Sequence, residues 1–279
     1  MRRPPSRSGN ERRCRRILDT ARPLEVDDLD WDAVGSVSVE PDVLRTLVYM
    51  RDVEGFTDRE LGGFTGHRTT LADPIVRDFL ALWRAEEAVH AATIDQYLAR
   101  YSYVTAVALP ARQLPPDTPP PRLERVLARV GGPVGRVVAA AHMAWGAANE
   151  QLTLHGYRLL ADRVDDPVLA TLLRRIAAQE GRHFSFYFLQ AQWRLEASPL
   201  ARRLLRRVLA GSWTPVGVGE GYKPAADFEA VLRHLAGEPS GVRAMARMDR
   251  RLASLPGLDG IAIYRRMTEQ VGAVPCPSV

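Results

Sequence analysis

Apolar residues recur at helical spacing along most of the chain from Pro41 onward. Steps of three and four residues place these side chains on one face of a helix. We therefore expect a first helix from Pro41 and three long helices, from about Asp73 to Tyr101, from Val134 to about Leu160, and from Asp166 to Glu196 or beyond. Two or three shorter helices are expected between 225 and 270. The sequence shows no alternating strand pair and no glycine-rich phosphate loop, so it predicts an all-α protein with a four-helix bundle in its middle.

Three segments interrupt the helical pattern. The proline-rich stretch Leu109–Arg122 is expected to be a long connection, because proline removes a backbone donor and breaks helices. The glycine-rich stretch Gly211–Lys223 is expected to be irregular. Residues 1–30 are polar and rich in arginine and proline, which predicts a basic, flexible N-terminal arm. Residues 31–279 are then predicted to form one domain, the bundle with its C-terminal helices.

On each of the four expected bundle helices, the stripe of apolar residues is interrupted by an ionisable residue at a position that should face inward. The second and fourth stripes carry a Glu-x-x-His pair, and this spacing places both side chains on one helix face. The first and third stripes carry a single glutamate. Taken alone, each pair is more typical of a solvated surface pair, but four helices show the same anomaly. The six residues are Glu54, Glu87, His90, Glu150, Glu180 and His183.

Four buried carboxylates and two histidines require a counter-charge, since an unpaired buried carboxylate costs several kcal/mol or takes up a proton. Two divalent iron ions would balance the four negative charges. The order Glu, Glu-x-x-His, Glu, Glu-x-x-His over four helices is typical of carboxylate-bridged di-metal centres in helical bundles. Mixed oxygen and nitrogen ligands favour iron, with manganese as the alternative, over zinc.

Composition limits the other functional classes. The content of 46% hydrophobic and 25% charged residues is typical of a soluble globular protein. We expect no membrane span and a cytoplasmic location, because no apolar stretch is long enough and none follows the basic N-terminus. Cys14 and Cys276 exclude a disulfide framework and a thiolate zinc site. The formal net charge of +5 favours an acidic partner, and we do not interpret the arginine content as nucleic-acid binding.

Several segments resemble the soluble acyl-acyl-carrier-protein desaturases, a family of ferritin-like di-iron oxidases. Trp83-Arg-Ala-Glu-Glu-Ala-Val-His90 and Glu180-Gly-Arg-His183 are similar to the two Glu-x-x-His helices of that family. Asn149-Glu150-Gln-Leu-Thr153 is similar to its third metal helix. Trp213-Thr-Pro-Val-Gly217 resembles a segment that follows the last metal helix in bacterial members. The resemblance covers about Pro41 to Gly219.

This resemblance implies a ferritin-like four-helix bundle with additional C-terminal helices. It implies a di-iron, O2-dependent desaturase that introduces a double bond into a carrier-bound acyl chain, with two iron ions as cofactor and O2 as co-substrate. The six residues above would be the metal ligands, and the Thr153 hydroxyl would be catalytic, beside bound oxygen. An acidic acyl carrier protein and a ferredoxin-type electron donor are the implied partners, and a homodimer is the expected assembly.

Gln179 departs from the pattern of the familiar plant members, which carry an aspartate before the second ligand glutamate. That aspartate belongs to a chain of contacts leading to iron, and a neutral amide cannot orient or charge-balance the neighbouring histidine as a carboxylate would. The usual electron path is therefore in question, and Trp31 is only a weak candidate for its tryptophan.

Two alternatives to a desaturase remain open. One is a di-iron oxygenase, a hydroxylase or N-oxygenase, on the same bundle, and the other is a non-catalytic iron-binding protein. Surface and channel residues are also expected from the sequence. An arginine cluster is predicted to dock the acidic carrier, and a set of apolar residues is predicted to be ordinary core or, as the weaker alternative, the lining of an acyl channel. The cluster is Arg202, Arg203, Arg206 and Arg207, and the apolar set is Phe79, Met143, Ile176, Phe184 and Phe188.

Overall fold

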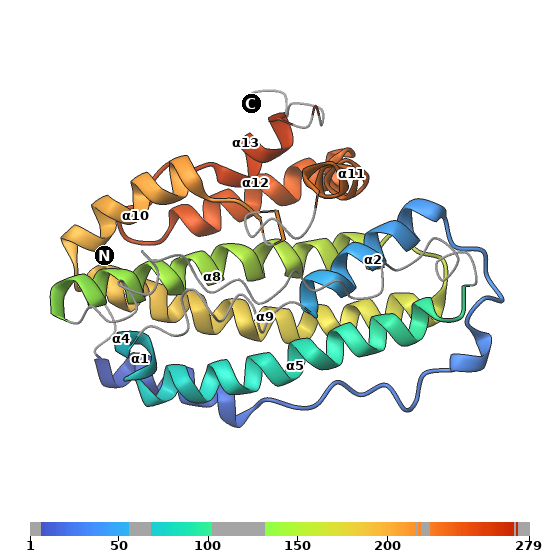
Figure 1. Ribbon diagram of the computed structural model, residues 1–279, viewed down its shortest axis with the longest axis horizontal. Helices are drawn as coiled ribbons and strands as arrows, with labels where there is room; N and C mark the ends of the chain where they lie inside the picture. The colour runs from blue at the N-terminus through green and yellow to red at the C-terminus, as the bar shows by residue number, and fades with distance from the viewer. Residues whose placement is uncertain are drawn as a thin grey trace.

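The computed structural model describes residues 7–55, 68–101, 132–215, 217–218, 224–270 and 272. Within these residues every regular element is helical, which confirms the predicted fold class. Helices α8 and α9 run side by side along the long axis of the molecule, with α5 against α9 and α2 against α5 (Figure 1). The bundle helices are α2 (Pro41–Glu54), α5 (Pro74–Leu98), α8 (Gly132–Ala161) and α9 (Pro167–Glu196).

Proline and a side-chain cap define where two of the bundle helices begin. The Asp73 carboxylate accepts a hydrogen bond from the backbone N–H of Ile75, and the next residue is a proline at the first helical position. Asp166 accepts from the N–H groups of Val168 and Leu169, again followed by proline. The carboxylate satisfies N–H groups that have no partner within the helix, and proline has no N–H to satisfy there. Both helices therefore begin at fixed residues, which sets their register in the bundle.

A glycine allows α8 and α9 to approach closely. A Cβ atom added at Gly146 would lie 2.5 Å from two ring carbons of Tyr187, which is far inside van der Waals contact. Because this position lies one turn before Glu150 on α8, the close approach brings that turn of α8 against the middle of α9.

The apolar core consists of two clusters that lie on either side of a buried polar layer. One cluster contains buried residues from the first half of α5, the first half of α8 and the last half of α9. The other contains residues from the last half of α5, the last half of α8 and the first half of α9. The positions between them on α5, α8 and α9 hold buried charged or amide side chains. The members of this layer are Glu86, Glu87, His90, Glu150, Gln151, Gln179, Glu180 and His183.

Four further helices follow the bundle and cover the outer side of α8 (Figure 1). They confirm the prediction of additional C-terminal helices after the ferritin-like bundle, and two shorter elements lie in the connections. The C-terminal helices are α10 (Pro199–Ser212), α11 (Ala225–Ala236), α12 (Pro239–Ala253) and α13 (Ile263–Gln270), and the short elements are α4 (Arg68–Leu71) and the 3-10 helix η1 (Trp31–Ala33).

The N-terminal segment differs from the expected arm. Residues 7–19 form helix α1 (Arg7–Asp19), which packs against α9 and α5. The Cys14 side chain is fully buried and accepts a hydrogen bond from the Gln190 amide at 3.4 Å. One narrow apolar face is enough to dock this helix, although most of its residues are polar. The proline-rich stretch 109–122 and Cys276 lie outside the described residues. Among the described helices, none is long and apolar enough to cross a membrane.

Candidate metal centre

The structure brings all six predicted ligand residues together in the polar layer of the bundle. They form two groups whose oxygen and nitrogen atoms lie within 4.8 Å of one another, close enough to hold a metal ion. We call them the Glu54 half and the Glu150 half. Glu87 and Glu180 belong to both halves, so these two carboxylates could be shared by two metal ions. The Glu54 half is Glu54, Glu87, His90 and Glu180, and the Glu150 half is Glu87, Glu150, Glu180 and His183.

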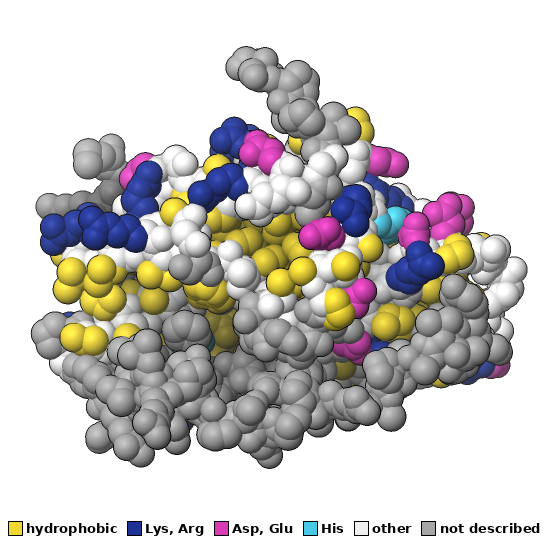
Figure 2. All heavy atoms as spheres, turned by 45° about the horizontal axis from the view of Figure 1, so that its top comes forward, with side chains coloured by type: hydrophobic (Ala, Val, Ile, Leu, Met, Phe, Trp, Pro, Cys, Tyr) yellow, Lys and Arg dark blue, Asp and Glu magenta, His cyan; other side chains and the backbone are white. Residues whose placement is uncertain are grey.

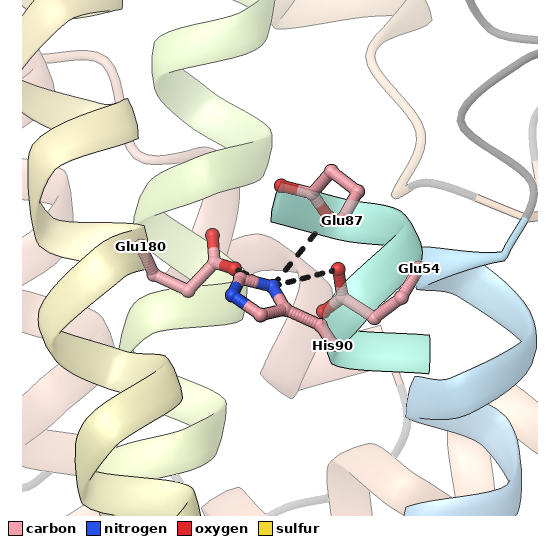
Figure 3. A group of neighbouring side chains, drawn as sticks. All are labelled: Glu54, Glu87, His90 and Glu180. Atoms are coloured by element: carbon pink, nitrogen blue, oxygen red, sulfur yellow. Dashed lines mark ion pairs between the residues drawn. The ribbon is translucent and has the colours of Figure 1, made fainter. Parts of the chain in front are cut away.

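In the Glu54 half, three carboxylates surround the Nδ1 atom of His90 (Figure 3). This atom lies 3.0 Å from Glu180 Oε1, 3.6 Å from Glu54 Oε2 and 4.0 Å from Glu87 Oε2. The residues come from α2, α5 and α9, and His90 is fully buried. Nδ1 is therefore the imidazole nitrogen that faces the carboxylates.

The Glu150 half repeats this arrangement around His183. Its Nδ1 atom lies 3.1 Å from Glu87 Oε1, 3.4 Å from Glu180 Oε2 and 3.5 Å from Glu150 Oε2. The two imidazole rings are 6.0 Å apart between centroids. Each half thus offers one nitrogen, one carboxylate of its own and two shared carboxylates.

Gln179 forms a hydrogen bond with the His90 ring nitrogen that faces away from the carboxylates. Its Oε1 atom lies 2.8 Å from His90 Nε2, and its amide nitrogen donates a hydrogen bond of 2.8 Å to the backbone carbonyl of Arg22. A carbonyl can only accept, so the amide NH2 must face Arg22 and the amide oxygen must face the histidine. His90 therefore donates from Nε2, and Nδ1 is the nitrogen that would serve as a metal ligand after losing its proton.

A carboxylate supports the other histidine. Glu86 Oε2 lies 2.7 Å from His183 Nε2, and Arg182 donates a hydrogen bond of 2.7 Å to the second Glu86 oxygen. The carboxylate can only accept, so Nε2 of His183 donates, and Nδ1 is the nitrogen that would serve as a metal ligand after losing its proton. Sequence analysis missed Glu86 and Arg182, although each stands directly beside a predicted ligand.

Tyr157 is a further contact that sequence analysis did not assign. Its hydroxyl donates a hydrogen bond of 2.6 Å to Glu54 Oε1, across 103 positions of the sequence. The residue lies two turns after Glu150 on the same face of α8, which is the signal that marks it in the sequence.

Burial and mutual repulsion control the protonation of the carboxylates. Burial, together with the nearby charges of Glu54 and Glu180, raises the pKa of Glu87 well above its ordinary value. Burial and the charge of Glu180 do the same to the pKa of Glu150. Burial also acts to raise the pKa of Glu180, but the neighbouring imidazoles of His183 and His90 outweigh it and lower this pKa. The metal-free site therefore carries protons on some of its acids.

The histidines hold protons as well. Burial alone would lower the pKa of His90, but the Glu180 and Glu54 carboxylates raise it to about 10. Burial is likewise outweighed at His183, where Glu180, Glu150 and Glu86 raise the pKa well above its ordinary value. Protons thus supply the positive charge that four buried carboxylates need in the absence of another cation.

Each of the two groups could hold a metal ion. Atoms directed at the centre are buried and make no hydrogen bond to any described residue: His90 Nδ1, His183 Nδ1, Glu87 Oε1 and both Glu180 oxygens. Buried polar atoms are nearly always hydrogen-bonded, so a set that converges on one point is the arrangement expected for metal ligands. Carboxylate oxygens and imidazole nitrogens are ligands for iron or manganese.

A small apolar cavity of about 70 Å³, partly open to solvent, adjoins the centre. Its walls come from α2, α8, α11 and α12, and they include the ligand Glu54, Thr153 and Gly156. The Thr153 hydroxyl donates back to the Asn149 carbonyl one turn earlier. Pro215 completes the wall, and the Trp213 indole beside it donates to the Asn149 side chain at 3.2 Å.

The apolar set singled out in the sequence does not line this cavity, in agreement with its interpretation as ordinary core. All five residues are buried, in the two apolar clusters on either side of the polar layer. The cavity instead lies toward the C-terminal helices, whose position relative to α8 the periodicity does not encode.

Trp31, the weak candidate for the relay tryptophan, and Gln179 both donate to backbone carbonyls of the N-terminal segment. The Trp31 indole donates to the Val26 carbonyl, and the Gln179 amide donates to Arg22. Of the arginine cluster, Arg203, Arg206 and Arg207 are exposed and Arg202 is half-buried. Arg206 also donates to the backbone carbonyl of Asp259.

Comparison of the chain with protein-family models, with curated proteins and with solved structures found no match. The geometry of the site is therefore the basis for inferring function.

Proposed function

We propose that the protein is a di-iron, O2-dependent desaturase that acts on an acyl chain held by an acidic carrier protein. The observation that carries the proposal is the convergence of six buried ligands next to an apolar cavity that reaches Glu54 and Thr153. An apolar cavity beside the metal site favours an apolar substrate over iron storage alone. A hydrocarbon chain is such a substrate, because burial of its surface is favoured by about 25 cal/mol per Å².

Iron bound in the centre would supply the activation of O2 that removal of hydrogen from an unactivated C–H bond requires. The residues of this protein would position the substrate and keep water out of the site. The cavity walls would hold one methylene near Glu54 and exclude water. The Thr153 hydroxyl in the same wall would donate toward the cavity after turning away from the Asn149 carbonyl, to which it donates in this structure. Gln179 and Glu86 fix the histidine rings so that both Nδ1 atoms face the ligand set. A ferredoxin-type protein is the proposed electron donor.

The carrier would dock on the outer face of α10. Leu200, Leu204 and Val208 are exposed there at intervals of one turn, and Arg203 and Arg207 are exposed beside them. At the left of Figure 2, where α10 lies in Figure 1, basic side chains border a patch of hydrophobic ones. No residue of α10 is acidic. An acidic helix with an apolar stripe would match both features.

Turnover of a carrier-bound acyl chain tests the activity. The iron-loaded protein, supplied with O2, a reductant and a ferredoxin, is expected to give a product that has lost two hydrogens, as measured by mass spectrometry. A product that has gained oxygen would assign the oxygenase alternative. Iron uptake without any product from acyl, aminoacyl or amine substrates would leave the non-catalytic alternative.

Charge reversal tests the docking face. Arg203→Glu combined with Arg207→Glu should slow carrier association about tenfold or more at low salt, because long-range steering acts mainly on the association rate. The matched control is Arg77→Glu with Arg84→Glu, two exposed arginines on α5, which changes the net charge equally. If both double variants slow association to the same extent, the effect comes from net charge and not from α10.

A further inference from the structure

The two halves of the metal centre are supported by chemically different groups. In the Glu150 half, His183 donates its Nε2 proton to a carboxylate, that of Glu86, at 2.7 Å. In the Glu54 half, His90 donates its Nε2 proton to the neutral amide of Gln179 at 2.8 Å. A hydrogen bond to a carboxylate leaves more electron density on the opposite ring nitrogen, which makes the imidazole a stronger ligand.

A second difference acts in the same direction. The Tyr157 hydroxyl donates a hydrogen bond of 2.6 Å to Glu54, a carboxylate that belongs to the Glu54 half alone. This hydrogen bond withdraws electron density from the Glu54 carboxylate and makes it a weaker ligand. The Glu87 and Glu180 carboxylates are shared, so they do not distinguish the halves. The Glu54 half therefore has the weaker histidine and a carboxylate already engaged by a phenol.

We infer that the centre fills in order, with the first divalent ion held in the Glu150 half and a second, more weakly held ion in the Glu54 half. Groups behind metal ligands change affinity by about 10- to 100-fold, so the two steps should differ by about that factor. Glu54 also lines the apolar cavity, which places the more exchangeable ion on the side of the proposed substrate. The inference rests on the di-metal part of the proposed function and is independent of the reaction that follows.

Anaerobic titration of the metal-free protein with Mn2+ tests this order. Equilibrium dialysis measures the two dissociation constants, and electron paramagnetic resonance separates isolated from coupled Mn2+. We expect the isolated spectrum to grow up to one equivalent and to give way to the coupled spectrum on addition of the second. Coupled pairs from the first addition, or two equal and independent steps, would overturn the inference while leaving the di-metal proposal intact. Binding of fewer than two ions even at saturation would instead contradict the di-metal proposal.

Variants assign each step to its half. Glu86→Gln should weaken the first step about 10- to 100-fold, so that the two steps merge. Tyr157→Phe removes the hydroxyl without changing the ring, and Gln179→Glu places a carboxylate behind His90; both should strengthen the second step. The matched control is Gln190→Glu, which introduces the same change at another buried position of α9 and should leave both steps unchanged. Weakening of the second step by Glu86→Gln, or an unchanged second step in Tyr157→Phe, would contradict the assignment.

Discussion

Loading the metal-free protein with two divalent ions at pH 7 is expected to release about four protons. The pKa of His90 is raised to about 10 by Glu180 and Glu54, and that of His183 is also raised. Burial and neighbouring carboxylates raise the pKa of Glu87 and Glu150 well above the ordinary value. Each of these raised pKa values favours the protonated form, and each group must lose its proton to become a ligand, which sets four as the expected number.

The size of the effect follows from the number of protons. Each displaced proton weakens binding tenfold for each unit by which the pH falls. The product of the two dissociation constants should therefore rise about 10⁴-fold from pH 7 to pH 6. Isothermal titration calorimetry with Mn2+ measures the number directly, when it is repeated in two buffers with different enthalpies of ionisation.

A pair of variants shows where the protons come from. Glu150→Gln removes one of the four groups and should lower the release to about three, provided that both ions still bind. Glu238→Gln changes a carboxylate whose side chain is 71% exposed and should leave the number unchanged. Release of one proton or none by the wild-type protein would refute the reasoning, because these side chains would then not exchange protons for metal.

Three further predictions concern the surroundings of the site. Burial and the nearby Arg158 and Arg247 lower the pKa of His155 to about 4. As the pH falls below about 6.5, His155 therefore takes up a proton in the unfolded chain before it does so in the folded protein. The free energy of unfolding should thus fall by up to about 3 kcal/mol between pH 7 and pH 4 because of this histidine. In His155→Gln, urea titration should show a fall that is smaller by this amount. Burial raises the pKa of the Cys14 thiol to about 11, so in a Cys276→Ser background it should react with iodoacetamide only when α1 opens, at a rate that urea increases. Gly156→Leu should fill part of the cavity and shift turnover toward shorter acyl chains. Gly156→Ala should not, because its Cβ would meet the flexible end of Met50 at 3.1 Å and Leu235 Cδ1 at an ordinary 3.7 Å.

The ligand residues could be predicted because they violate a periodic pattern. Glu87 and Glu180 each stand in an apolar stripe with a histidine three residues later, and a stripe of this kind faces the core of a bundle. Four such interruptions on four helices are rare enough to define a site. The same periodicity placed the bundle helices, since their length and caps are local properties of the sequence.

The groups behind the ligands could not be predicted, because their partners are distant in the chain. The Gln179 amide meets Arg22 across 157 positions, and Tyr157 meets Glu54 across 103. These contacts depend on how α1, α2, α8 and α9 are packed, which no local pattern encodes. Helix α1 illustrates the converse: its arginine-rich sequence is typical of a solvated arm, and a single narrow face around Cys14 nevertheless docks it.

Diffraction from crystals of the iron-loaded protein, collected at the iron absorption edge, tests the central claim most directly. We predict two anomalous peaks between α2, α5, α8 and α9, both in contact with Glu87 and Glu180, with His90 Nδ1 on one and His183 Nδ1 on the other. Loss of both peaks in Glu180→Ala crystals that keep the fold would strengthen the assignment. Iron bound elsewhere, or no peak between these carboxylates at saturating iron, would contradict it.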